Sequence, residues 1–101
     1  MDITIQNNEK VVTAILNGRL DSITAPDAET TLLPLMEEEG LETLVLDCSQ
    51  LDYIASSGLR LFFTLLKQGR AQGIRVVLKR VNDFVREVLD STGLSAMFEF
   101  E

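Results

Sequence analysis

The sequence contains no histidine, and this absence removes several kinds of enzyme chemistry. Without an imidazole a Ser-His-Asp triad cannot form, and no histidine can act as a general base or as a metal ligand. The Gly-x-x-x-x-Gly-Lys-Ser/Thr loop that cradles nucleotide phosphates is also missing, which argues against a P-loop nucleotide hydrolase. We therefore expect a protein that is not an enzyme and that has no cofactor and no metal site.

Cysteine and basic residues are scarce. Cys48 is the only cysteine, so the chain has no internal disulfide and no cluster of thiolates for zinc. Because it follows an apolar run, we interpret Cys48 as a small buried residue and not as a reactive thiol. Lysine and arginine number 9 against 16 aspartates and glutamates, which gives a net charge of −7. This charge repels nucleic acid and anionic lipid, so we expect no direct nucleic-acid partner.

Long hydrophobic runs are absent as well. No apolar segment approaches the length of a membrane-spanning helix, and no basic segment followed by an apolar one marks a secretory signal. We therefore expect a cytoplasmic protein with no membrane insertion. The 101 residues contain no linker, repeat or low-complexity segment, so residues 1–101 are predicted to form a single domain.

What the sequence does contain is a regular succession of strand and helix patterns. Strand patterns occur at residues 3–5, 11–16, 43–47 and 74–78, with a short fifth one at 97–100, and helical patterns follow residues 24, 56 and 82. A polar turn between the first two strands indicates an antiparallel hairpin, and the later alternation of strands and helices indicates parallel pairing. We predict an α/β fold with a single mixed, mostly parallel sheet of four to five strands and three helices packed against it.

Local signals predict where the helices begin and end. Thr24 or Ser22 is expected to cap the first helix, in which Pro34 should cause a kink because proline removes a backbone hydrogen bond. Asn82 is expected to cap the third helix, and Gly93 suits the residue that follows its last turn.

The most informative stretch leads from the central strand into the second helix. Residues 43–46 form an apolar run that ends at Asp47, which is typical of a strand buried on both faces. Ser56, Ser57 and Gly58 then occupy a predicted helix start, where free N–H groups favour an anion or a phosphorylated hydroxyl. On this local chemistry two interpretations stay open: one serine caps the helix, or one serine is functional.

The second helix has a wide apolar face. Its spacing predicts an inner stripe made of Leu59, Phe62, Phe63 and Leu66. Leu61 and Leu65 lie on a flank of this stripe. Either they complete the packing against the sheet or a neighbouring helix, or they extend a docking surface beside Ser57.

Two motifs resemble the signature of the STAS domain, the fold of bacterial anti-sigma factor antagonists. The turn Gly18-Arg19-Leu20-Asp21 resembles the Gly-x-Leu-Asp turn of that family, and Ser56-Ser57-Gly58-Leu59 resembles the end of its Asp-Ser-Ser-Gly-Leu motif. Each motif alone is weak, but here they occur in the right order in a chain of the right size. The resemblance covers essentially the full length.

The resemblance implies a partner switch. In such antagonists an ATP-dependent anti-sigma factor serine kinase phosphorylates the serine before the glycine, here Ser57, and a serine phosphatase of the metal-dependent class removes the phosphate. The unphosphorylated antagonist binds the kinase, which releases a sigma factor. The resemblance also implies that Asp21 holds the Ser57 hydroxyl. The expected partner-binding residues are Asp21, Ser56, Ser57, Gly58, Arg60 and Leu61.

Two positions depart from the family pattern. Phosphorylated members usually have an aspartate before the two serines, where this chain has Ala55, and Arg60 occupies a position that is often small. Ala55 favours an alternative, a STAS interaction subunit of a lipid transporter or other signalling complex without a phosphate cycle. A receiver domain phosphorylated on Asp47 is disfavoured, because residues 7–9 replace the acidic pair that would hold its metal.

Overall fold

The computed structural model describes residues 1–101 and contains one five-stranded sheet in the order β1-β2-β3-β4-β5. The strands are β1 (Asp2–Asn8), β2 (Val11–Leu20), β3 (Thr43–Ile54), β4 (Arg75–Lys79) and β5 (Glu99–Phe100). β1 pairs with β2 in antiparallel fashion, and the other neighbouring strands are parallel. The predicted mixed, mostly parallel sheet with an antiparallel edge hairpin is confirmed.

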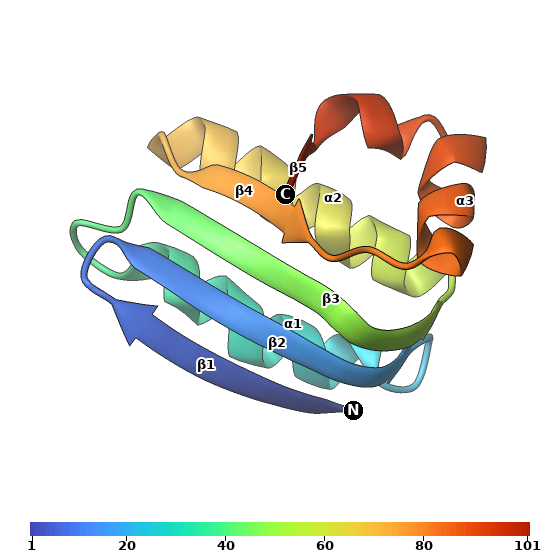
Figure 1. Ribbon diagram of the computed structural model, residues 1–101. Helices are drawn as coiled ribbons and strands as arrows, with labels where there is room; N and C mark the ends of the chain where they lie inside the picture. Colours follow the sequence, from blue (N-terminus) through green and yellow to red (C-terminus); the bar gives the residue numbers. More distant parts are fainter.

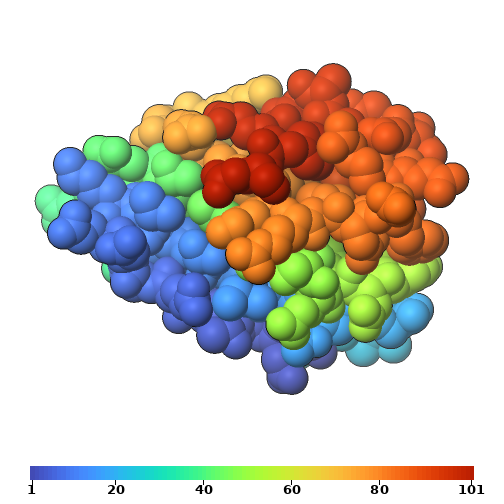
Figure 2. All heavy atoms as spheres, viewed as in Figure 1, coloured from blue at the N-terminus to red at the C-terminus, as the bar shows by residue number.

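Three α-helices and two short 3-10 helices connect the strands. They are α1 (Ala25–Leu32), η1 (Leu33–Glu37), α2 (Ser56–Gln72), α3 (Asp83–Ser91) and η2 (Leu94–Met97). Helices α1 and α2 cover one face of the sheet, and α3 lies beside the carboxyl end of β3 (Figure 1). In the space-filling view the N-terminal strands and the C-terminal segments occupy opposite sides of the molecule (Figure 2). None of the helices combines the length and apolar character needed to span a membrane.

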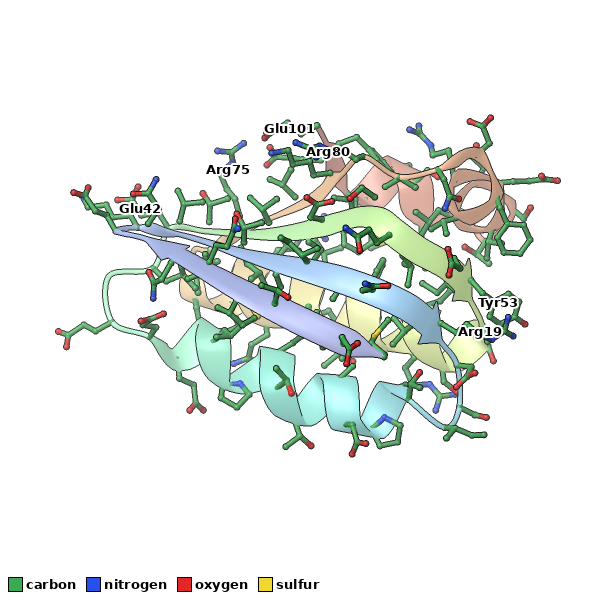
Figure 3. The ribbon with its side chains drawn as sticks, turned by 60° about the horizontal axis from the view of Figure 1, so that its bottom comes forward. Arg19, Glu42, Tyr53, Arg75, Arg80 and Glu101 are labelled. Atoms are coloured by element: carbon green, nitrogen blue, oxygen red, sulfur yellow. The ribbon has the colours of Figure 1, made fainter.

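The core lies between the sheet and the two helices that cover it. Along β2 the side chains of Val12, Ala14 and Leu16 are buried while Val11 is exposed, which is the alternation of a strand with one covered face. In β3 several successive residues are buried, as the apolar run predicted. A second view shows α1 along one face of β1 and β2, with no helix on their other face (Figure 3).

Strands β2 and β3 are both longer than the sequence predicted. β2 continues to Leu20, and β3 continues past Asp47 to Ile54. Irregularities in the register between the two strands keep them paired beyond the predicted ends, and Gly18 has a φ of +118° there, which glycine adopts without strain. Asn17 and Gly18, which are typical of a strand end, therefore lie at β-bulges within a longer strand.

The boundaries of α3 follow the predicted signals, whereas the end of α1 differs from the prediction. The side chain of Asn82 accepts a hydrogen bond from the N–H of Val85 at 2.8 Å, and Gly93 follows α3 with a φ of +77°, so both predictions are confirmed. Pro34 does not kink an α-helix. Instead α1 ends at Leu32 and the chain continues as the 3-10 helix η1, because proline cannot donate the hydrogen bond that would extend α1.

Helix α2 buries a face rotated from the predicted one. Its buried residues are Gly58, Leu61, Phe62, Leu65, Leu66 and Gly69, whereas Leu59 and Phe63 are only partly buried. Gly58 and Gly69 determine which face of α2 is buried. A Cβ atom at Gly58 would lie 2.7 Å from Cγ1 of Ile54, and one at Gly69 would lie 2.7 Å from the carbonyl oxygen of Ile74. Helix α2 therefore comes closest to its neighbours at Gly58 and Gly69, which have no side chain. A pattern of apolar residues does not reveal such positions.

Candidate functional site

The predicted site residues meet at the carboxyl edge of β2 and β3. Leu20 and Ile54, the last residues of these strands, are register partners, and the N–H of Ala55 donates to the carbonyl oxygen of Leu20 at 2.9 Å. The segment that leads into α1 and the segment that opens α2 therefore start side by side. This placement brings Asp21 to the same end of the sheet as the two serines, as predicted.

The first turn of α2 has no side-chain cap. Ala55 occupies the N-cap position with an extended backbone (φ −105°, ψ −179°), and no side chain hydrogen-bonds to the first turn. The interpretation that one of the serines caps the helix is wrong, because Ser56 and Ser57 are its first two helical residues. The N–H groups of this turn have no acceptor within the helix. Alanine is also among the poorest N-cap residues.

The two serines face different parts of the surface. Ser57 is half-buried and lines a shallow cleft between α1 and α2, together with Ser22, Ala25, Pro26, Glu29 and Arg60. Ser56 is more exposed and lies on the opposite flank of α2, beside an apolar groove that Leu59, Phe63 and Leu94 line. Arg60 borders both hollows, because on a helix it is the surface neighbour of both serines.

Asp21 stabilises its own turn. Its Oδ1 accepts hydrogen bonds from the N–H groups of Ile23 (3.0 Å) and Thr24 (3.1 Å), and Oγ1 of Thr24 accepts from the N–H of Asp21 (3.0 Å). This reciprocal pair closes the turn that precedes α1. Thr24 occupies the N-cap position of α1, as predicted for Thr24 or Ser22, but its side chain makes no capping hydrogen bond to the helix. The backbone hydrogen bonds from Thr24 and Ile23 lower the pKa of the Asp21 carboxyl.

The expected contact between Asp21 and Ser57 is not present. The side-chain hydrogen bonds of Asp21 go to Ile23 and Thr24, and its nearest cation is Arg19, with Nε 3.9 Å from Oδ2. Asp21 therefore shapes the loop on the α1 side of the cleft, while the Ser57 hydroxyl has no bond to it. The family resemblance implied that Asp21 and Ser57 lie at the same end of the sheet, but the hydrogen-bond partners of Asp21 depend on the turn geometry.

Two of the expected partner-binding residues face the core. Gly58 is packed against the side chains of Leu20 and Ile54, and Leu61 is only 2% exposed. Leu61 and Leu65 therefore complete the packing of α2, and the alternative that they extend a docking surface is wrong. At the start of α2 a partner can reach Ser56, Ser57 and Arg60, while Gly58 and Leu61 hold the helix in place.

The sequence did not reveal an exposed aromatic group at the same edge. The rings of Tyr53 and Phe84 stack with centroids 5.9 Å apart, and the Arg19 guanidinium lies 4.2 Å from the Tyr53 centroid. Figure 3 shows Arg19 and Tyr53 next to each other at the ends of their strands. Phe84 is 48% exposed and Ile23 is 82% exposed. Arg19 and Tyr53 are register partners only because of the β-bulge before them, so strand patterns alone could not pair them.

The family model described as the STAS domain matches residues 2–101. This chain belongs to the STAS domain family. BtrV of Bordetella bronchiseptica, named as a candidate anti-sigma factor antagonist, is 33% identical over 98 residues, which cover 97% of this chain and 84% of that protein. The anti-sigma-B factor antagonist of Listeria monocytogenes is 29% identical over 104 residues, which cover 100% of this chain and 90% of that protein.

Solved structures share the fold of this STAS domain. The anti-sigma factor antagonist SpoIIAA in its unphosphorylated form superimposes with a TM-score of 0.84 at 19% identity, covering 99% of this chain and 88% of that one. The Bacillus cell fate determinant SpoIIAA in its phosphorylated form gives a TM-score of 0.77 at 18% identity, covering 99% of this chain and 91% of that one. The predicted STAS fold is therefore confirmed.

Asp47 and Cys48 lie within β3 of the STAS domain. Asp47 is 6% exposed, and its Oδ1 accepts a hydrogen bond from the N–H of Ser49 at 3.0 Å. Burial alone would raise the pKa of Asp47, but the bonds from Ser49 and the charges of Arg80 and Lys79 lower it overall. Burial raises the pKa of the Cys48 thiol to about 12, which agrees with a structural and not a reactive cysteine.

We expect the substitution Ala55→Asp to stabilise the STAS domain by roughly 0.5–2 kcal/mol. The backbone of Ala55 already has the extended conformation of an N-cap residue, so the new carboxylate can accept a hydrogen bond from the N–H of Ser57 or Gly58. Thermal unfolding followed by circular dichroism should show a midpoint higher by several degrees.

The matched control is Ala71→Asp, which places the same charge at an exposed position in the last turn of α2. There a carboxylate meets the negative end of the helix dipole, so the control should lower the unfolding midpoint. If both variants shift the midpoint in the same direction, the effect does not come from capping.

Proposed function

We propose that this STAS domain is an anti-sigma factor antagonist that works by partner switching. In its unphosphorylated form it binds an anti-sigma factor serine kinase through the edge that carries Ser56, Ser57, Arg60 and the loop at Asp21. Phosphorylation of Ser57 ends that binding. The observation that carries this proposal is the position of Ser57, which lies in the uncapped first turn of α2 and lines an open cleft. The names of its relatives in Bordetella and Listeria support the same role.

The charge of a phosphate explains how one modification can act as a switch. A phosphoserine adds about −1.5 to −2 charges at neutral pH. At the start of α2 this charge meets free N–H groups and the positive end of the helix dipole, so the fold tolerates it. At a packed interface with a kinase the same charge has to be desolvated, so the interface does not tolerate it.

The modification transfers the γ-phosphoryl group of ATP to Oγ of Ser57. The new O–P bond forms while the bond from the γ-phosphorus to the bridging oxygen breaks, ADP leaves, and the hydroxyl proton passes to a base of the kinase. The chain itself has no histidine to act as that base. Hydrolysis by a metal-dependent serine phosphatase restores the hydroxyl and releases inorganic phosphate.

The choice of Ser57 over Ser56 rests on the family motif. Neither serine caps α2, so capping does not separate them. Ser57 directly precedes Gly58, whose missing side chain allows the helix start to pack against Leu20 and Ile54. This packing fixes which of the two serines lies in the cleft between α1 and α2.

The test is incubation of the purified protein with ATP and each anti-sigma kinase of its own genome, followed by mass spectrometry. We expect one added phosphate on Ser57. The substitution Ser57→Ala should abolish it, and Ser56→Ala should keep it. Phosphate mapped to Ser56, or no phosphate with any kinase, would contradict the proposal.

Ala55 supports a second candidate function, an interaction subunit of a lipid transporter or other signalling complex without a phosphate cycle. The residue that usually precedes the two serines in phosphorylated members is absent here. Purification of the protein with its partners from its own organism distinguishes the two functions. A complex that forms equally well with and without ATP favours the second.

A further inference from the structure

Arg60 lies in the same cleft as the serine that we propose is phosphorylated. Ser57 and Arg60 are three residues apart on α2, and both line the hollow between α1 and α2. Residues at this spacing are neighbours on a helix surface, with Cβ atoms about 5–6 Å apart. The long arginine side chain can therefore reach a group attached to Oγ of Ser57.

The guanidinium of Arg60 has no partner within the protein. The four ion pairs are Lys10–Glu42, Arg19–Asp21, Arg75–Glu99 and Arg86–Asp90. The three cations that lie over aromatic rings are Arg19, Lys67 and Arg86. Arg60 belongs to neither set. In a protein with a net charge of −7, a free guanidinium beside the proposed phosphorylation site is available to bind an anion.

We propose that Arg60 binds the phosphate on Ser57 within the same molecule; this inference rests on the proposed function. The planar guanidinium matches two phosphate oxygens with two parallel N–H donors, a geometry that lysine cannot reproduce. Arg60 thus holds the phosphate against α2 in the cleft, so that it does not extend freely into solvent.

The other charges around the cleft oppose the phosphate. Glu29 of α1 lines the cleft, and Asp21 lies at the end of β2, where Ile23, Thr24 and Arg19 already engage its carboxylate. Arg60 is the cation that lines the cleft together with Ser57. The balance between Glu29 and Arg60 therefore sets the electrostatic environment of the phosphate.

This contact gives the switch a second component. In the unphosphorylated protein the guanidinium of Arg60 is free to pair with a carboxylate of the kinase. After phosphorylation the same guanidinium is occupied by the phosphate on Ser57. The modification therefore adds a repulsive charge to the interface and also withdraws an attractive one.

The test uses phosphoserine incorporated at position 57 during translation, so that no kinase is needed. Phosphorus NMR then follows the second ionisation of the phosphate from about pH 4 to about pH 8, the range in which this group titrates. A nearby cation favours the doubly charged form, so the phosphate pKa should be lower in the protein with Arg60 than in Arg60→Gln, by about half a unit. Arg60→Lys should keep part of this difference, because it keeps the charge.

The control is Lys67→Gln, which removes a cation from the same helix about 15 Å along its axis from Ser57. This variant should leave the phosphate pKa unchanged. Equal values in the Arg60 and Arg60→Gln proteins overturn the contact. That result is independent of the proposed function, because the phosphate is supplied by translation. Failure of every kinase to modify Ser57 contradicts the proposed function and leaves the titration unaffected.

Discussion

The substitution Ser57→Asp is expected to lower the affinity for the anti-sigma kinase partner at least about a hundredfold while the domain remains folded. A carboxylate at this position stays compatible with the helix start, where the dipole favours it by roughly 0.3–1 kcal/mol. In the interface it has to lose its water without a new basic partner, which costs several kcal/mol. A hundredfold loss corresponds to about 2.8 kcal/mol, so the desolvation is sufficient. Calorimetric titration against the purified kinase measures the change.

Three comparisons make this result specific. Ser57→Ala removes only a hydroxyl, so it should bind the kinase about as well as the parent protein and resist phosphorylation. Ser56→Ala should bind and still accept phosphate. Urea unfolding of Ser57→Asp should show a free energy of unfolding close to that of the parent. Unchanged affinity of a folded Ser57→Asp protein means that Ser57 does not lie in the interface.

The largest expected loss of stability follows from Phe62→Ala. The Phe62 side chain is fully buried (0% exposed), and its ring meets Phe98 edge to face with centroids 6.3 Å apart. Replacing a buried phenylalanine by alanine costs about 3–5 kcal/mol, because burial is lost and a cavity remains. Small domains have a total stability of about 5–15 kcal/mol, so this single change removes a large fraction of it. Urea unfolding measures the loss.

The adjacent residue provides the control. Phe63 is only partly buried, borders the groove beside η2 and has Nζ of Lys67 5.6 Å from its ring centroid. Phe63→Ala should therefore cost on the order of 1 kcal/mol, well below the cost at Phe62. The apolar spacing of the sequence predicted that both rings belong to the inner stripe. Equal losses at the two positions would support that spacing and contradict the rotated face of α2.

Features that depend on neighbours in the sequence could be predicted without a structure. The order of strands and α-helices along the chain followed from apolar periodicity, because a strand alternates every second residue and a helix repeats about every 3.6 residues. The cap at Asn82, the turn at Gly93 and the burial of Cys48 were equally local. The position of Ser57 in the first turn of α2 was predictable because the chain leaves a strand just before Gly58.

Features that depend on which segments lie side by side were decided by the tertiary structure. The bulges that extend β2 and β3 exist because the two strands stay paired, and they place Arg19 beside Tyr53. The buried face of α2 follows from the closest approach of its backbone to the sheet at Gly58, where a side chain would collide with Ile54. Whether the guanidinium of Arg60 forms an ion pair likewise depends on which carboxylates the fold places within its reach. Sequence patterns record the chemistry of each residue, but close contacts between distant segments are properties of the folded chain.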